Sequence, residues 1–209
     1  MKLVIVKYNA GNIQSVLYAL ERIGMEAIVT DDHEQIQTAD KVIFPGVGEA
    51  STAMNYLKER GLDTVIKNLQ QPVLGICLGM QLMCTYSEEN DTKCLGIFEE
   101  QVKWFKTAAT NTSAKSYSKS VQSAIKIPQI GWNNIYNLQT PLFKGIAENS
   151  YCYFVHGYYA ALGEHTIATT DYIQSYSSAL HKNNFYATQF HPEKSGEAGQ
   201  KILENFIAL

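Results

Sequence analysis

Residues 71–86 read QPVLGICLGMQLMCTY and combine a strand pattern with a helix pattern. The apolar run at 72–76 is typical of a buried strand, and the residues from Leu78 onward favour a helix. Cys77 therefore lies on a sharp turn between Gly75 and Gly79. Because a strand followed directly by a helix belongs to a right-handed crossover unit, this stretch predicts a parallel sheet covered by helices on both faces.

The residues before this stretch repeat the same alternation of strand and helix. Asn12 is a predicted N-cap, and Gly24 and Gly61 are predicted to end helices. Strands are expected at 3–6, 27–30, 41–44 and 72–76, and helices at 13–23, 50–60 and 62–69. The pattern predicts a doubly wound α/β fold with a mainly parallel sheet.

The second half of the chain has a different pattern of predicted strands and helices. Short β-like runs at 100–105, 151–155 and 185–190 should extend the sheet or add a small antiparallel one, and residues 196–209 favour a last helix. Residues 107–124, TAATNTSAKSYSKSVQSA, contain few large apolar side chains. Since such a segment buries too little to offset its ordering entropy, we expect a mobile surface loop.

Composition limits the possible classes of function. A chain of 209 residues with 45% hydrophobic residues suits a single domain, 1–209. The net charge of -3 disfavours a nucleic-acid partner. The first residues, MKLVIVKYNAGN, contain no signal-peptide core and no membrane span, so we expect a cytosolic protein. The four cysteines lack metal-ligand spacing, and in a reducing compartment they should be free thiols. We expect no metal and no cofactor.

Cys77 has two interpretations. Taken alone, a cysteine is more often a small packing residue than a nucleophile. The strand, turn and helix around Cys77, however, form a nucleophile elbow, which holds the thiol out of the sheet beside a helix N-terminus that favours the thiolate.

A cysteine nucleophile needs a base and a group that orients the base. The stretch QFHPEKS (189–195) follows a predicted strand, and in an extended chain His191 and Glu193 project to the same side. Glu193 could then accept from one imidazole nitrogen while the other faces Cys77. The alternative is that His191 caps a strand and Glu193 is a solvated charge. The elbow favours the triad.

The stretch FPGVG (44–48) can supply an oxyanion hole. Its glycines permit unusual backbone angles, so N–H groups of Gly46, Val47 and Gly48 could turn toward an oxyanion, with the N–H of Leu78 as a second donor. Alone, the same residues would be a turn that ends a strand.

Together these motifs resemble the class I glutamine amidotransferases, the triad glutaminases. The match is closest to the glutaminase subunits of imidazole glycerol phosphate synthase in histidine biosynthesis. It covers nearly the whole chain through the motifs YNAGNIQSV, FPGVGEA, GICLGMQLM, IPQIGWNNI, YFVHGYY and QFHPEKSGEAG. The resemblance implies a flavodoxin-like α/β fold, L-glutamine as substrate and ammonia as a product.

The resemblance also implies residue roles. Cys77 would attack the side-chain amide of glutamine, His191 would carry the proton to ammonia, and Glu193 would orient His191. Residues 46–48 would form the oxyanion strand, and the glutamine would be held by Gln81, His156, Gly157 and Tyr158.

The implied partner is a barrel-shaped (TIM-barrel) cyclase subunit, which activates the glutaminase and receives ammonia through an internal passage. That cyclase makes imidazole glycerol phosphate and AICAR from the ribulosyl intermediate PRFAR. Trp132 and Lys194 match the interface and gate positions. For Trp132, ordinary core packing is an equal alternative.

The chain departs from the family pattern at three motifs. It has Lys7-Tyr8-Asn9 for tyrosine-aspartate-tyrosine, Gly157 for serine, and Gln129-Ile130 for histidine-methionine. We expect the first and third departures on the side that faces the partner. At Gly157, any substrate contact would have to come from the backbone. The segment 107–124 is also longer than the family pattern.

Three other functions remain open on the sequence. The chain could serve a different aminating synthase, such as one acting on a nucleotide sugar, or hydrolyse γ-glutamyl compounds without a partner. A non-catalytic binding protein on the same fold is disfavoured by the presence of all three triad residues.

Overall fold

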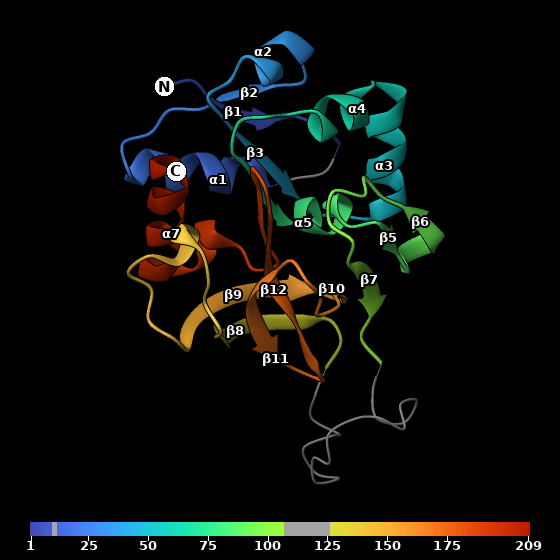
Figure 1. Cartoon of the computed structure of the whole chain (residues 1–209), viewed down its shortest axis with the longest axis vertical. Helices are drawn as coiled ribbons and strands as arrows, with labels where there is room; N and C mark the ends of the chain where they lie inside the picture. The colour runs from blue at the N-terminus through green and yellow to red at the C-terminus, as the bar shows by residue number, and fades with distance from the viewer. Residues whose placement is uncertain (10–11, 107–125) are drawn as a thin grey trace, which may run out of the picture.

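The computed structural model describes residues 1–9, 12–106 and 126–209 (Figure 1). The loop predicted at 107–124 lies outside the described residues. The helices are α1 (Ile13–Arg22), α2 (His33–Gln37), α3 (Ala50–Glu59), α4 (Leu62–Lys67), α5 (Leu78–Met83) and α7 (Gly196–Ala208), with short 3-10 helices η1 (Glu89–Asp91), η2 (Pro141–Phe143) and η3 (Pro192–Lys194).

The strands of the first half are β1 (Leu3–Val6), β2 (Ile28–Thr30), β3 (Lys41–Gly46), β4 (Val73–Cys77), β5 (Tyr86–Ser87) and β6 (Thr92–Lys93). Those that follow are β7 (Gln101–Trp104), β8 (Gln129–Ile135), β9 (Ser150–His156), β10 (Tyr158–Ala160), β11 (Thr166–Asp171), β12 (Ser175–Lys182) and β13 (Phe185–Thr188).

The main sheet has a parallel centre and an antiparallel extension. Its order is β2-β1-β3-β4-β13-β12-β10-β7-β5-β6, and β11 pairs with β12. Strands β2, β1, β3, β4 and β13 are parallel, and β12 is antiparallel to β13. Since β13 comes from the end of the chain yet pairs with β4, the sheet brings residues 185–188 beside 73–76.

Helices cover both faces of the parallel centre because its strands are apolar on both sides. Val4 and Val6 of β1 pack in one buried cluster with residues of α2, α3, α4 and α5. Leu3 and Ile5 of the same strand pack in a second cluster with residues of α1 and α7. The predicted doubly wound α/β fold is confirmed.

The residues predicted to begin and end helices act as predicted. The Asn12 side chain accepts from the N–H of Ser15 at the start of α1, and Gly24 and Gly61 adopt positive φ after α1 and α3. Helix α2 and the strands β5, β6, β8, β10, β11 and β12 were not predicted, and β3 continues through Pro45 and Gly46, past its predicted end at Phe44.

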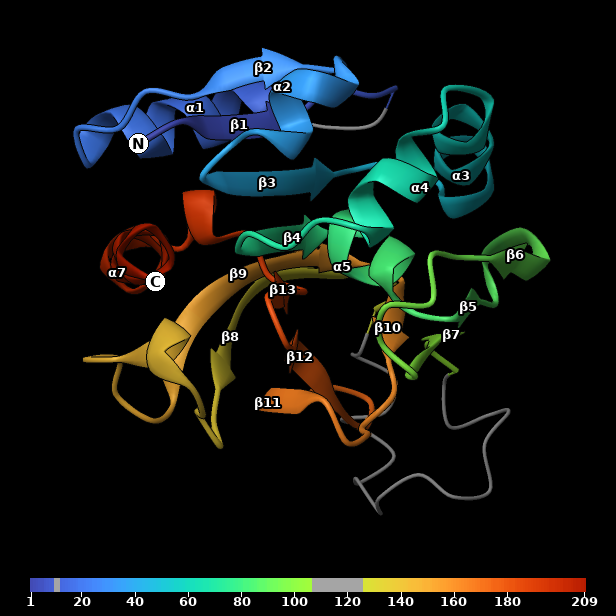
Figure 2. The ribbon, with the colours of Figure 1, turned by 45° about the horizontal axis from the view of Figure 1, so that its top comes forward.

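The expected small antiparallel sheet is the pair β8 and β9, a curved ribbon below the parallel strands in Figure 2. Its inward residues Ile135, Cys152 and Phe154 belong to the cluster that contains α1 and α7. Its outward side carries Ile130, Trp132, Tyr151, Tyr153 and Val155, of which all but Tyr153 are exposed. We call these five residues the outer face of β8–β9.

Candidate active site

Cys77 ends β4 and stands directly before α5. Its backbone has φ 53° and ψ -108°, a combination that an L-residue adopts only under strain. Such strain is characteristic of a nucleophile elbow, in which a side chain is held at the end of a strand. The thiol is buried and lies 3.8 Å from the carbonyl oxygen of Val155.

Close backbone packing explains the glycines around Cys77. A Cβ at Gly79 would overlap the carbonyl oxygen of Phe44, so α5 can approach β3 only with glycine there. In the parallel register Gly46 lies opposite Cys77, where a Cβ would overlap the Tyr8 hydroxyl and lie 2.8 Å from Leu78 Cβ. The predicted oxyanion segment therefore packs directly against the elbow.

His191 and Glu193 are in contact. The imidazole Nδ1 lies 2.7 Å from Oε1 of Glu193, and both side chains are buried. The expectation of an extended chain was wrong in detail, since β13 ends at Thr188 and residues 192–194 form η3. Pro192, which lacks an N–H, begins this single turn. The turn, and not strand alternation, brings the carboxylate to the imidazole.

The environment of His191 favours a charged imidazole. Burial lowers its pKa, but the negative charge and hydrogen bond of the Cys77 sulfur, together with the Glu193 carboxylate, outweigh burial and raise the pKa to about 10. An imidazolium beside a cysteine stabilises the thiolate, which is the nucleophilic form. The cluster is thus capable of acyl transfer through sulfur.

The predicted substrate segment, residues 156–158, connects with Gln81 through hydrogen bonds. Gln81 Nε2 donates to the Tyr158 carbonyl oxygen at 2.9 Å and to Gln189 Oε1 at 3.0 Å. Gln189 Nε2 in turn lies 3.7 Å from the Cys77 sulfur. These contacts join α5, the residue after β13 and the start of β10 around the thiol.

His156 differs from His191 in its charge state. Burial lowers the pKa of His156 to about 4, so its ring is neutral at pH 7. Its Nδ1 lies 2.7 Å from the Tyr158 carbonyl oxygen and therefore carries the proton, because a carbonyl only accepts. Its Nε2 lies 3.3 Å from the Tyr176 hydroxyl, which donates to Gln129 Oε1 at 3.0 Å.

This network corrects the position expected for one departure from the family pattern. Gln129 is only 3% exposed and cannot lie on a partner-facing surface, whereas the next residue, Ile130, is exposed. Side chains alternate along β8, which explains the opposite directions. In the first departure Tyr8 is likewise buried, between exposed Lys7 and Asn9.

A cavity of about 220 Å³ opens beside the thiol. Most of the predicted site residues line it, namely Val47, Gly48, Cys77, Leu78, Gln81, His156, Gly157, Tyr158, His191 and Lys194. Glu193, which contacts His191, and Gly46, which is buried at the end of β3, are not among the lining residues.

Two lining residues, Glu89 and Val155, were not predicted. Glu89 is held by the N–H of Ala50, and burial raises the pKa of its carboxyl. The sequence gives no signal for Glu89, which reaches the cavity through packing of a distant segment, whereas Val155 stands in the motif YFVHGYY directly before the predicted His156.

Trp132 lies on the surface, not in the core. Its side chain is 55% exposed on the outer face of β8–β9, and its ring contacts Tyr153 edge-on with centroids 5.8 Å apart. The core-packing alternative is therefore wrong. Val155, on the same face, also lines the cavity, so the exposed apolar surface reaches the mouth of the site.

The other cysteines have a different environment from Cys77. Cys84, Cys94 and Cys152 are buried free thiols, and burial raises their pKa values. Inert packing is the role that this environment favours.

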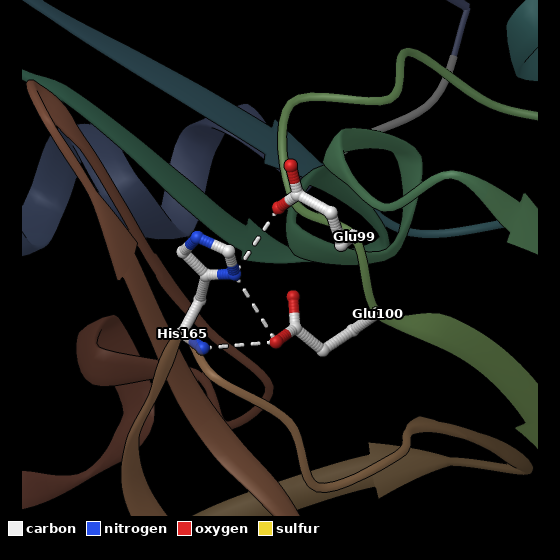
Figure 3. Close-up of side chains that lie close together, drawn as sticks. All are labelled: Glu99, Glu100 and His165. Carbon is white, nitrogen blue, oxygen red and sulfur yellow. Dashed lines mark hydrogen bonds and ion pairs between the residues drawn. The ribbon is translucent and has the colours of Figure 1, made fainter.

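A separate cluster of Glu99, Glu100 and His165 contains the kinds of atoms that bind metal ions (Figure 3). His165 Nδ1 lies 3.2 Å from the Glu99 carboxylate and 3.3 Å from that of Glu100. Lys182 also donates to Glu99, so its ammonium already balances one of the negative charges. These polar contacts, with one ion pair between Lys182 and Glu99, join residues 99–100 to β12 and to the residue before β11.

The comparisons with known proteins agree with this geometry. A family model described as glutamine amidotransferase class-I matches residues 4–209. The chain belongs to the class-I glutamine amidotransferase family. It is 56% identical over 209 residues to the protein of Bacteroides fragilis named imidazole glycerol phosphate synthase subunit HisH, and 54% identical to that of Bacteroides thetaiotaomicron. Both matches cover 100% of this chain and 100% of the relative.

Solved structures share the fold. The crystal structure of a glutamine amidotransferase matches with a TM-score of 0.68 at 18% identity, covering 98% of this chain and 97% of that one.

Among the helices of residues 1–9, 12–106 and 126–209, none has the length and apolar character needed to cross a membrane.

Proposed function

We propose that this chain is the glutaminase subunit of an imidazole glycerol phosphate synthase of histidine biosynthesis. It hydrolyses L-glutamine to glutamate and ammonia and passes the ammonia to a cyclase subunit. The contact of His191 with both Cys77 and Glu193, in a chain 56% identical to a protein named for that subunit, carries this proposal. We expect the reaction in the cytosol.

Cys77 is the nucleophile in this proposal. Its sulfur attacks the side-chain amide carbon of glutamine, and the negative charge develops on the amide oxygen, near backbone N–H groups of residues 46–48 and Leu78. His191, held by Glu193, gives its proton to the departing ammonia. A γ-glutamyl thioester remains on Cys77.

Water then attacks the thioester. His191, now neutral, takes a proton from the water, the sulfur leaves as thiolate, and glutamate is released. These steps need no metal or organic cofactor. Gln81 and residues 156–158 hold the α-amino and α-carboxylate groups of glutamine, and the Glu89 carboxylate lies in the same cavity, where it suits the α-ammonium group.

The cyclase docks on the outer face of β8–β9. Exposed aromatic and apolar residues such as Trp132, Tyr151 and Ile130 are the types that form the centre of protein interfaces. Because Val155 belongs both to this face and to the cavity, a barrel seated there covers the mouth of the site. Lys194 lines that cavity and serves as the gate.

The test of this proposal is reconstitution. The purified chain is mixed with a histidine-pathway cyclase subunit, and glutamate release is measured with and without the cyclase's ribonucleotide ligand. We expect a strong increase only in the complete mixture. Equal turnover by the chain alone would instead support a γ-glutamyl hydrolase, and activation only by another aminating synthase would identify a different partner.

The nucleophile is tested by Cys77→Ala in the same mixture. The variant should lose glutaminase activity while the cyclase still works with added ammonium salts. Cys84→Ala is the matched control, because Cys84 is buried at the end of α5 and should leave turnover unchanged. Glutamine hydrolysis by Cys77→Ala would show that the nucleophile is another residue.

A further inference from the structure

Trp104 is a large aromatic residue that the proposed mechanism does not use. It ends β7 and is 39% exposed. In the antiparallel register it lies opposite Tyr158 of β10, and the two rings meet edge-on with centroids 4.7 Å apart. The backbone N–H of Trp104 donates to the Glu88 carboxylate at 2.8 Å. The indole is thus held beside the segment 156–158.

Gly157 is the residue on which this indole lies. A Cβ at Gly157 would be 2.6 Å from Cζ3 and 3.1 Å from Cη2 of Trp104, well inside the contact distance of two carbon atoms. Both atoms belong to a rigid ring, so no small torsion of a flexible end relieves the overlap. The indole therefore occupies the space that a side chain at position 157 would need.

The position of this segment controls the cavity. The Gly157 carbonyl accepts from the N–H of Phe105 at 3.1 Å, so the end of β7 holds the segment through the backbone as well. The Tyr158 carbonyl accepts from Gln81 at 2.9 Å and faces Nδ1 of His156 at 2.7 Å. A shift of residues 157–158 is therefore transmitted to two side chains that line the cavity.

We infer that Trp104 is a positioning residue of the glutamine site and that Trp104 and Gly157 are a size-matched pair. The indole replaces the side chain missing at 157 and fixes the backbone of residues 157–158 where it contacts the substrate. This inference rests on the proposed glutaminase function. It assigns the substrate contact at Gly157 to the backbone and makes it dependent on a side chain outside the cavity.

The test is a double-mutant cycle on the complex with the cyclase, using the wild type, Gly157→Ser, Trp104→Ala and the double variant. Because misplacement of a positioning group by 1 Å can cost 10²-fold, we expect Gly157→Ser to raise KM for glutamine about 10-fold or more, with a smaller change in kcat. Trp104→Ala should raise KM about 3-fold. The KM of the double variant should be at least about 3-fold lower than that of Gly157→Ser.

Thermal unfolding of the four chains supplies a readout that does not depend on activity. Gly157→Ser should lower Tm by about 4 °C in the wild-type background and by less than half of that in the Trp104→Ala background. Trp104→Phe, which keeps an aromatic ring, should keep KM within about twofold of wild type, while Tyr18→Ala, which removes an exposed aromatic on α1, should leave KM unchanged.

Several results would overturn the inference. An unchanged KM in Gly157→Ser would contradict the size match between the two residues. An unchanged KM in Trp104→Ala would contradict the positioning role of Trp104. A double variant as impaired as Gly157→Ser would show that the two residues are not coupled. A wild-type complex without glutaminase activity would instead reject the proposed function. In that case the thermal cycle still decides the pairing of Trp104 with Gly157.

Discussion

The two sides of the cavity differ in the sequence separation of the strand pairs that support them. We call residues 46–48, 77, 78 and 81 the elbow wall, and residues 155–158 and 191 the strand wall. The elbow wall joins the ends of two adjacent parallel strands with the helix that follows one of them. The strand wall combines β9 and β10 with His191, which follows β13. Of these strands, β13 pairs with β4 and β10 pairs with β7, both much earlier in the chain.

Two glycines are required by different contacts: Gly79, between the elbow-wall residues Leu78 and Gln81 on α5, and Gly157 of the strand wall. At Gly79 the atom that excludes a side chain is the backbone carbonyl oxygen of Phe44, in the centre of the sheet. At Gly157 it is the ring of Trp104, a side chain at the surface. Backbone in a central strand cannot move without breaking the ladder, whereas a side chain can be shortened by substitution. The elbow wall is therefore expected to be rigid, and the strand wall adjustable by substitution.

The largest expected effect is that of Glu193→Gln. Loss of the carboxylate leaves His191 without the charge that orients it, so turnover of the complex should fall by about 10² to 10⁴. Glutamate release at saturating glutamine measures this loss. Glu197→Gln, an exposed acid at the start of α7, is the matched control and should be neutral. A loss of less than twofold would refute the triad.

The second prediction concerns the rigidity of the elbow wall. Gly79→Ala should lower the free energy of unfolding by about 3 kcal/mol, because the new Cβ overlaps the Phe44 carbonyl oxygen. Gly96→Ala is the control, since Gly96 has φ +70° but open space around it, and should cost only about 1 kcal/mol. Urea unfolding measures both. Equal costs would mean that the backbone at Phe44 yields to the new Cβ and that the elbow wall is not rigid.

The third prediction uses the neutral His156 of the strand wall. Its pKa in the folded chain is about 4, while the unfolded chain takes up the proton near pH 6.5. The unfolded state therefore binds more protons between these values, and stability falls as pH decreases through this window, by about 2 kcal/mol from pH 7 to pH 5.

Urea unfolding at pH 7 and pH 5 measures this loss, with His156→Gln as the comparison. The variant has no imidazole at this position, so its stability should fall by about 2 kcal/mol less over the same interval. Identical pH slopes in the two chains would contradict the assignment of a buried neutral ring.

The smallest effect is expected at Glu89, which lines the cavity but belongs to neither wall. If its carboxylate pairs with the α-ammonium group of glutamine, Glu89→Gln should raise KM about 10-fold and leave kcat within about twofold. The amide keeps an oxygen for the N–H of Ala50, so the fold is not disturbed. Glu59→Gln, an exposed acid on α3, is the control. A fall in kcat with unchanged KM would exclude this binding role.

The elbow wall could be predicted from the sequence because its signals are local. Gly75, Cys77 and Gly79 stand within five residues of one another, between a strand pattern and a helix pattern. The contact of His191 with Glu193 was also predicted, although the chain forms it through η3. Pro192 was visible in the sequence, and its effect on the backbone was not taken into account.

The strand wall could be predicted only in part. The motif YFVHGYY marked residues 156–158, but Gln129, Tyr176 and Trp104, which surround them, lie 18 to 54 residues away along the chain. Gln129 was expected on the surface and is buried, because its direction depends on the register of β8 with β9. For Trp132 the sequence could not distinguish an interface position from core packing. The same register turns its side chain outward.

The sequence by itself determined the parallel α/β centre, the elbow at Cys77 and the candidate catalytic residues. This was possible because periodicity, glycine placement and helix caps act within a few residues. Only the tertiary structure decided which distant side chains meet: β13 beside β4, His191 at the thiol, Glu89 in the cavity and Trp104 over Gly157. The physical reason is that strand pairing and burial are long-range, so a side chain's neighbours and charge state are fixed by the assembled sheet.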